Sequence, residues 1–297
     1  GVFGGLCAAG GQVVEPTVRP IAIPPSTWPD LVGLDPTSGP GSLLWRTVAD
    51  AAGDATAEVN VESTAVDNSA CSPSIADLRT RIEASEAPPD ARRTVTNHLR
   101  LAESWGVFDA DAPPVTAFSA DGSPTVLDLA GVPEAAAAAV VRAVSRGLYD
   151  ARVAEKIDRL PWLLVDEAHA FFGGVADPAL RTLLTRGRAP GVSLVCATQR
   201  PGAVPSVAVS QSDLLIAHRL TAEQDVARLA EAEATYLAGD LASQLPTGTG
   251  EAFVVDDATE TTIRVRERRT PHEGGSPRAS RMPGAARSDS ADPEDRR

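Results

Sequence analysis

Two short apolar segments of this chain end in polar residues that could handle a metal ion and a water molecule. Residues 163–169 run from leucine and valine into the adjacent carboxylates Asp166 and Glu167, and residues 196–201 end in Thr-Gln-Arg-Pro. Buried strands of a parallel sheet deliver catalytic groups in this way, at their carboxyl ends. One carboxylate can hold the water shell of Mg²⁺ while the other orients an attacking water. The pair therefore predicts part of a nucleoside triphosphatase site.

Gln199 extends this prediction, because the carboxyl ends of parallel strands share one edge of the sheet, where Gln199 could face the same cleft as Glu167. An amide both donates and accepts hydrogen bonds, which suits sensing a γ-phosphate or orienting water. The alternative is a strand whose exposed end is acidic without any catalytic role. We expect His169 merely to begin the helix or loop after the strand, although Asp-Glu-Ala-His also occurs in superfamily-2 helicases.

Four arginines are candidates for supplying positive charge to a phosphate. Arg186 and Arg188 lie close to glycines, and Arg200 and Arg219 each follow a predicted strand. They could act within this chain or on a neighbouring subunit. Their alternative role is a solvated helix or strand end, since a helix C-terminus favours cations.

The sequence contains no phosphate-binding P-loop. Such a loop needs G-x-x-x-x-G-K-[ST], whose backbone amides and lysine cradle the phosphates. The single lysine, Lys156, lies in Ala-Glu-Lys-Ile-Asp, with no glycine beside it and no hydroxyl after it. The sequence therefore predicts the residues that bind the metal ion and orient water, but it contains no loop that binds phosphate.

The charge balance is acidic. There are 40 acidic and 27 basic residues, a net charge of −13, and all of the basic residues except Lys156 are arginine. An acidic, lysine-poor surface suggests a GC-rich genome and a halophilic origin, with a generic acidic surface as the alternative. This charge disfavours nucleic acid binding over the whole surface, although a local basic groove remains open.

The cysteines and the hydropathy indicate the compartment in which we expect the protein. Cys7, Cys71 and Cys196 lie far apart, which favours a reducing cytoplasm over a disulfide framework or a zinc site. No apolar run approaches 18 residues and no signal peptide is present, so we expect a cytoplasmic protein without a membrane span.

The pattern of elements predicts an α/β fold with a small helical insert at residues 30–110. The expected helices of the insert are 42–52, 74–86 and 89–105, with a strand at 18–25 before them and a loop at 54–72 within them. After the insert we expect a hairpin (115–118 with 125–129), helices at 133–156, 178–186 and 222–232, strands at 162–165, 193–198 and 214–220, and a second hairpin (251–255 with 262–266). Alternating strands and helices imply a mostly parallel, wound sheet covered on both faces. In residues 269–297 Gly, Pro, Ser, Arg and Asp dominate and the one large apolar residue is Met282, so this segment is predicted to be a disordered tail.

Four segments together resemble the HerA/FtsK superfamily of pumping ATPases, with the archaeal HerA-like branch as the nearest match. They are residues 163–169, 186–192, 197–201 and 209–220, in that order. The resemblance implies a RecA-like P-loop NTPase core, a homo-hexameric ring, ATP with Mg²⁺ as cofactors, and translocation of DNA or sometimes protein. A nuclease partner follows by family analogy.

The resemblance also implies roles for single residues. Asp166 would hold Mg²⁺ through water, Glu167 would polarise the attacking water and Gln199 would sense the γ-phosphate. Arg188 or Arg186 would act as a sensor or finger. Thr198 and Arg200 are the remaining candidates for contact with the nucleotide.

The missing P-loop is a large departure from this family. The simplest interpretation is that residues 1–268 form a partial RecA-like domain, incomplete at its N-terminus, so that the chain is inactive as it stands. The alternative is an assembly or regulatory protein with a motor-like fold and no catalysis. A superfamily-2 DEAH helicase is a weaker alternative, because Thr-Gln-Arg-Pro at 198–201 speaks against it.

Overall fold

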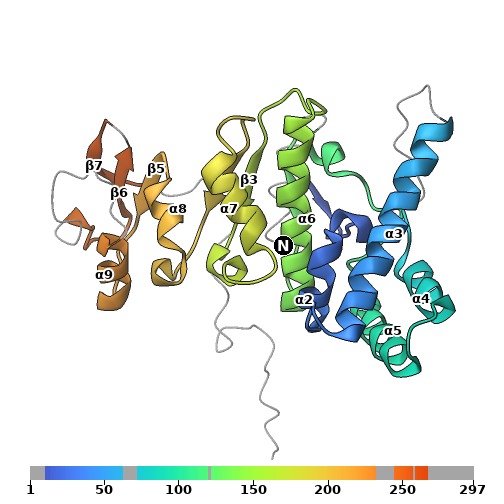
Figure 1. Ribbon diagram of the computed structural model, residues 1–297. Helices are drawn as coiled ribbons and strands as arrows, with labels where there is room; N and C mark the ends of the chain where they lie inside the picture. The colour runs from blue at the N-terminus through green and yellow to red at the C-terminus, as the bar shows by residue number, and fades with distance from the viewer. Residues whose placement is uncertain (1–10, 63–71, 120–121, 232–243, 257, 267–297) are drawn as a thin grey trace, which may run out of the picture.

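The computed structural model describes residues 11–62, 72–119, 122–231, 244–256 and 258–266 (Figure 1). The helices are α2 (Trp28–Val32), α3 (Gly39–Glu62), α4 (Ile75–Ala84), α5 (Pro89–Ser104), α6 (Glu134–Val153), α7 (Asp177–Arg186), α8 (Ser206–Ser210) and α9 (Glu223–Glu231). The strands are β1 (Gln12–Val14), β2 (Thr125–Leu127), β3 (Trp162–Val165), β4 (Ser193–Cys196), β5 (Leu214–Ala217), β6 (Glu251–Asp256) and β7 (Glu260–Arg264). Five short 3₁₀ helices also occur in these residues: Pro20–Ala22, Pro25–Thr27, Val115–Ser119, Ala168–Phe171 and Pro201–Ala203.

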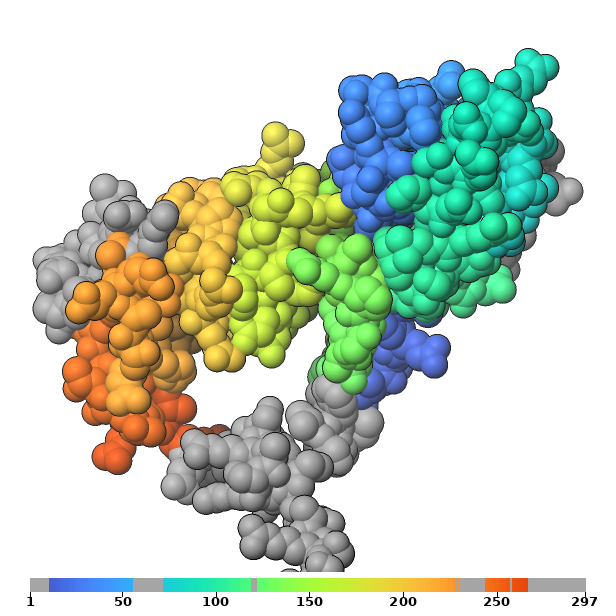
Figure 2. Space-filling model, turned by 90° about the horizontal axis from the view of Figure 1, so that it is seen from below, coloured from blue at the N-terminus to red at the C-terminus, as the bar shows by residue number. Residues whose placement is uncertain are grey.

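Helices α2 to α5 form a helical lobe, residues 28–62 and 72–104, at one end of a curved body, and β5 to β7 lie at the other end (Figures 1 and 2). The lobe packs around Trp28 and Leu44, which are fully buried, and Trp28 stacks on Phe108 with ring centroids 5.0 Å apart. The same apolar cluster continues into α6 through Val140 and Val144. The lobe and α6 therefore share one core.

The three helices predicted for this region are present, but the loop expected at 54–72 is wrong over residues 54–62. There α3 continues to Glu62. Alanines dominate residues 49–57, and alanine has the highest helix propensity. Ala51 and Ala55 are also buried, so small residues supply the packing that larger apolar residues supply elsewhere. Residues 63–71 lie outside the described part of the chain.

The predicted strand at 18–25 is also wrong. Val18 makes only a single bridge to Phe108, and 3₁₀ helices at Pro20–Ala22 and Pro25–Thr27 follow it. Prolines cannot donate to a strand ladder and fix φ near the helical value, which explains the change.

The first predicted hairpin is wrong as well, because its two arms take different partners. Residues Val115–Ser119 form a 3₁₀ helix, while β2 pairs in parallel with β1, more than a hundred residues away. Val115 and Phe118 instead pack against the shared core. The second predicted hairpin is confirmed: β6 and β7 are antiparallel, with Val255 opposite Glu260.

The predicted wound sheet is present only in part. Among the described residues β1–β2 and β3–β4 are separate parallel pairs, and β5–β6–β7 form an antiparallel sheet. The prediction of one mostly parallel sheet is therefore wrong for this part of the chain. The helices α7, α8 and α9 follow strands or their loops as an α/β fold requires.

One face of the β3–β4 pair is open, which contradicts the prediction of cover on both faces. Trp162 and Leu164 on this face are 68% and 69% exposed, and Val195 beside them is also exposed. The alternate residues, Leu163 and Val165, pack against buried side chains of the two apolar clusters that include α6 and α7. We call the exposed side chains of Trp162, Leu164 and Val195 the open face.

Two further predictions concern the C-terminal residues and the absence of a membrane-spanning helix. The predicted disordered tail, residues 269–297, lies outside the described residues. None of the helices in the described part of the chain has both the length and the apolar character that crossing a bilayer demands. The predicted domain division at residue 268, with the insert at 30–110, stays a prediction.

Ser74 begins α4 with a reciprocal capping box, and its removal should destabilise the lobe. Its hydroxyl accepts from the Asp77 backbone amide at 3.1 Å, and the Asp77 carboxylate accepts from the Ser74 backbone amide at 2.8 Å. We predict that Ser74→Ala lowers the free energy of unfolding by about 1 kcal/mol, measured by urea denaturation with tryptophan fluorescence.

The pH dependence provides a control. The hydrogen bonds from Ser74, side chain first and then backbone, lower the pKa of the Asp77 carboxyl below 3.8. Because this pKa is lower in the folded state, its stabilisation is present above pH 3.8 and is lost as the pH falls through the folded-state value. The Ser74→Ala deficit should therefore shrink in acid. Ser104→Ala, which removes a hydroxyl bonded to the Leu101 carbonyl, should show no such pH dependence. A deficit of equal size at all pH values would contradict the role of Asp77.

Candidate active site

The parallel register of β3 and β4 brings their carboxyl ends together. Val165 lies opposite Cys196, and two backbone hydrogen bonds of 2.9 Å continue the pairing beyond the strands, from Ala197 to Val165 and from Ala168 to Ala197. Val165 and Ala168 are buried in a small apolar cluster with Leu180 of α7. The polar residues that follow each strand are thereby anchored side by side.

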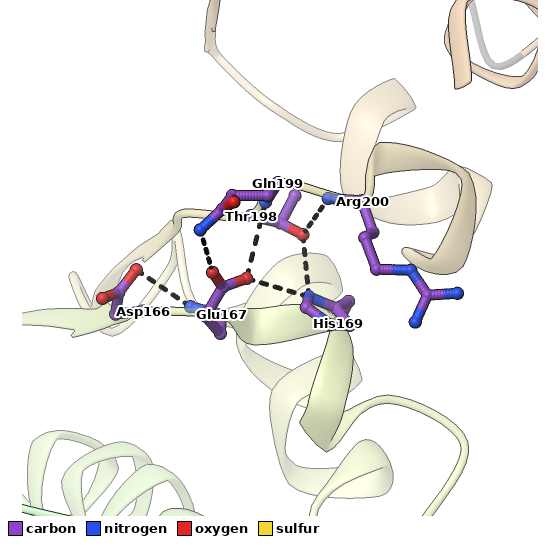
Figure 3. Close-up of polar contacts among 6 residues, drawn as sticks. All are labelled: Asp166, Glu167, His169, Thr198, Gln199 and Arg200. Atoms are coloured by element: carbon purple, nitrogen blue, oxygen red, sulfur yellow. Dashed lines mark hydrogen bonds and ion pairs between the residues drawn. The ribbon is translucent and has the colours of Figure 1, made fainter. Parts of the chain in front are cut away.

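Glu167 is the centre of the polar cluster at this edge (Figure 3). Its Oε1 accepts a 2.5 Å hydrogen bond from Gln199 Nε2, and its Oε2 lies 3.2 Å from His169 Nδ1. The Gln199 backbone amide also points at Oε2, at 3.5 Å. His169 Nδ1 lies 3.0 Å from Thr198 Oγ1, which links both strand ends. Glu167 and Gln199 thus face one another, as the sequence predicted.

The backbone at Glu167 is left-handed, with φ 47°. A non-glycine residue adopts this region at a free-energy cost, and such residues gather at functional sites. Here the left-handed residue ends β3 and begins the 3₁₀ helix Ala168–Phe171, so that Ala168 points into the core. The same turn directs the Glu167 carboxylate toward Gln199 on the neighbouring strand end.

Asp166 is exposed beside this cluster, and its Oδ1 accepts the backbone amide of Glu167 at 3.0 Å. A free carboxylate oxygen next to such an anchor fits a hard cation such as Mg²⁺, which keeps several waters and takes one or two protein carboxylates. Within the described ranges no group of three or more His, Cys, Asp or Glu side chains is placed to hold a metal. One carboxylate acting through water is therefore the chemistry that the residues fit.

Arg200 contributes its backbone rather than its side chain to the cluster. Its amide donates to Thr198 Oγ1 at 3.0 Å, while its guanidinium points away from Glu167 (Figure 3). The side chain borders a cavity of about 210 Å³ that is also lined by Gln224 and Asp225. The nearest acid to this cavity, Asp225, accepts the Gly202 amide at 3.2 Å.

The structure does not bring Arg186 and Arg188 to the cluster. Both arginines precede β4, whereas Gln199 follows it. The four residues of β4 span about 13 Å, so the arginines and Gln199 lie beyond opposite ends of this strand. Arg188 is almost fully exposed and meets only Asp213, at 3.5 Å, among the residues described. Lys156 also lies at the amino end of its strand, β3, away from Asp166. Arg219 is exposed after β5.

His169 is the site residue that sequence reasoning assigned to the start of a helix or loop. It does begin the 3₁₀ helix, but its ring also bridges Glu167 and Thr198. The available signal was its spacing: it is two residues after Glu167, where a tight turn returns the side chain to the same edge. Sequence alone could not show that this turn is a 3₁₀ helix with a left-handed residue before it.

Comparison with solved structures places this fold beside a known one. The chain is similar to VirB4 of Thermoanaerobacter pseudethanolicus, with a TM-score of 0.65 and 17% identity over 90% of this chain and 79% of that chain. The two share a fold. The genome packaging NTPase B204 from Sulfolobus turreted icosahedral virus 2, in complex with ATP-gammaS, matches 51% of this chain and 72% of its own at 16% identity. Its TM-score of 0.40 is too low to carry an argument. No protein-family model and no curated protein matches the sequence.

Cys196 lies on the covered side of β4 and should be unreactive. Burial raises the pKa of its thiol to about 11 from an ordinary 9.0, so about a hundredfold less thiolate forms at neutral pH. In a Cys7→Ser, Cys71→Ser background we predict that a thiolate-specific reagent labels Cys196 about a hundredfold more slowly than free cysteine at pH 8. The rate should rise about tenfold per pH unit toward pH 11. Labelling as fast as free cysteine would show that this side of β4 is open.

Proposed function

We propose that this chain is the water- and metal-handling part of an ATP-hydrolysing motor of the HerA/FtsK type. One observation carries the proposal: the Glu167 carboxylate, at the shared carboxyl end of two parallel strands, is held by Gln199 Nε2 at 2.5 Å and faces His169 Nδ1 at 3.2 Å. A carboxylate and an amide held together at this edge suit the orientation of an attacking water.

The fold supports this assignment at a coarser level. The chain shares the fold of VirB4, and its assignment to the P-loop ATPases is part of this proposal. The finer assignment to an archaeal, halophilic HerA-like branch is part of the proposal, and its support is the four segments of sequence resemblance and the acidic composition.

In this proposal each side chain of the cluster has one task. Glu167 accepts a hydrogen bond from the attacking water, and Gln199 keeps the carboxylate oriented until the amide turns to the γ-phosphate. Asp166 holds the water shell of Mg²⁺, and the bound Mg²⁺–ATP supplies the electrophilic phosphorus and the charge neutralisation. Thr198 and Arg200 steady the loop through the hydrogen bond between Thr198 Oγ1 and the Arg200 amide.

The phosphate-binding half comes, in this proposal, from a segment that carries G-x-x-x-x-G-K-[ST]. Residues 1–297 hold no such motif, and the open face offers that segment an apolar surface on which to pack. An uncovered sheet face with two side chains more than two-thirds exposed is costly in water, which supports a covering element.

A ring explains the position of Arg186 and Arg188. Both precede β4, whereas Gln199 follows it, and this separation supports a role toward a neighbouring subunit rather than in the site of their own chain. We therefore propose a homo-hexamer in which one of them acts as an arginine finger, with DNA as the translocated polymer, a nuclease as a possible partner of the family kind, and a cytoplasmic location.

Substitution of Glu167 tests the chemistry in the chain joined to a P-loop segment. We predict that Glu167→Gln lowers ATP turnover at least about a hundredfold, because the amide cannot act as a base, and leaves the nucleotide Kd within about twofold. The matched control is Glu155→Gln, which changes an exposed glutamate that also has a positive φ but lies before β3. Unchanged turnover in Glu167→Gln would refute the role of Glu167.

The division of the site makes a second prediction. Residues 1–297 alone should show no ATP turnover, and addition of the P-loop segment, in cis or as a second polypeptide, should restore it. Trp162→Ser and Leu164→Ser on the open face should prevent that restoration, whereas Leu101→Ser, an exposed leucine of α5, should not. Turnover by residues 1–297 alone would overturn the division. Failure of every P-loop segment to restore it would favour the non-catalytic assembly or regulatory protein.

A further inference from the structure

The helical lobe carries a cluster of arginines that the proposed ATPase site does not use. A cavity of about 280 Å³ opens between α4 and α5, lined by Arg92, Arg93, Arg100, Thr96 and Asn97, with Glu83 as its one acidic side chain and Pro89 at its edge. We call the first five residues the arginine pocket. Helix α5, which carries these residues, lies on the other side of α6 from β3 (Figure 1).

The spacing on α5 places these five donors on one face. Arg92, Thr96 and Arg100 are four residues apart, and Arg93 and Asn97 form a parallel row. The adjoining face, with Val95 and Leu99, is fully buried in the shared core, and Thr96 at the border of the two faces is itself buried, so α5 cannot rotate to hide the arginines. The core therefore fixes which face of α5 is presented to solvent.

Two of the pocket arginines, Arg92 and Arg100, lack the carboxylate partners that the arginines of α4 have. Arg79 and Arg81 of α4 are neutralised by carboxylates, Glu103 at 2.6 Å and Asp54 at 2.7 Å. Within the described residues, by contrast, the side chains of Arg100 and Asn97 make no hydrogen bond or ion pair.

The other two pocket arginines are also without strong neutralisation. Arg92 donates to the Glu83 backbone carbonyl at 2.9 Å, which fixes its side chain, and its Nε has no partner in the part of the chain described. Arg93 meets Asp90 at 3.0 Å in a pair that is almost fully exposed, and such pairs contribute little. The pocket thus holds guanidinium charge without a buried counter-charge.

We propose that the arginine pocket binds the phosphates of a nucleic acid backbone. Guanidinium groups pair with phosphate in forked geometry, and hydroxyl and amide donors such as Thr96 and Asn97 complete such contacts. From Arg92 to Arg100 the helix rises about 12 Å, a length over which one strand carries three or four phosphates. No aromatic residue lines the cavity, so we expect its contacts to be with phosphates and independent of sequence.

The charge of the rest of the molecule supports a localised contact. With a net charge of −13 the surface repels nucleic acid over most of its area, so binding requires a patch where arginines outnumber acids. The cavity has three arginines against one glutamate. This inference rests on the proposed function in one respect, that the bound nucleic acid is the polymer which the motor moves. The binding itself needs no ATP.

The test measures binding of fluorescein-labelled 30-mer DNA, single- and double-stranded, to the full chain by anisotropy without nucleotide. The triple variant Arg92→Gln, Arg93→Gln, Arg100→Gln should weaken binding at least tenfold at 0.1 M salt. It should also reduce the slope of log affinity against log salt by about two to three. The matched control, Arg46→Gln, Arg146→Gln, Arg181→Gln, removes the same charge from exposed helix positions and should weaken binding less than twofold.

The outcomes separate this inference from its competitors. Equal losses in the two triple variants, or no loss in either, would overturn it. Binding of poly-glutamate that depends on the pocket, without binding of DNA, would overturn it in favour of an acidic protein partner. If the triple variant does not fold, Arg100→Glu alone, at an exposed position without a partner among the described residues, should still weaken binding. Glu167→Gln should bind DNA as tightly as the unmodified chain. The DNA-binding result can therefore be interpreted even if the ATPase proposal fails.

Discussion

The parallel register of β3 and β4 is the constraint on which the candidate site depends. It sets Val165 opposite Cys196, and the backbone pairing continues through Ala168 and Ala197. Glu167 and Gln199 then meet at 2.5 Å with no further adjustment. A slip of one residue would turn Val165 to the open face and the Glu167 carboxylate away from Gln199, because side chains alternate along a strand. The covered face, packed against α6 and α7, prevents that slip.

The sequence predicted this edge well because the signal was local. An apolar run of four residues ending in two carboxylates leaves little choice of element, and β3 ends where expected. Asp166, Glu167 and Gln199 were therefore identified together. His169 was not, because its place depends on a left-handed residue and a 3₁₀ turn, and neither has a signature in residue type. The arginine pocket was also missed, since its donors are spread along an ordinary polar helix face.

Sequence reasoning failed where partners are distant. The segment at 125–129 looked like one arm of a hairpin, but β2 takes β1 as its partner instead. Hydrophobic pattern identifies a strand without identifying its neighbour, so the sheet was expected to be continuous. The alanine-rich half of α3 was missed for another reason: its buried face consists of small residues, which give little hydrophobic contrast. The open face was not predicted, because the alternation of strands and helices implied cover on both faces of the sheet.

Charge and apolar exposure together organise the molecule. The surface is mostly acidic, but two places on it carry arginines: the arginine pocket on the lobe and the segment before β4. Apolar side chains are exposed together on the open face. Each of these features is costly in isolation, and each has a place in the proposed motor. In that proposal the pocket would contact the polymer, the arginines before β4 would contact a neighbouring subunit, and the open face would receive the element that binds phosphate.

The most direct measurement is a structure of the chain together with its P-loop segment, bound to Mg²⁺ and a non-hydrolysable ATP analogue. The account predicts a water about 3 Å from the Glu167 carboxylate and in line with the γ-phosphate, with Asp166 facing the metal's water shell. A nucleotide whose γ-phosphate lies at the amino ends of β3 and β4, or away from both strands, would contradict it.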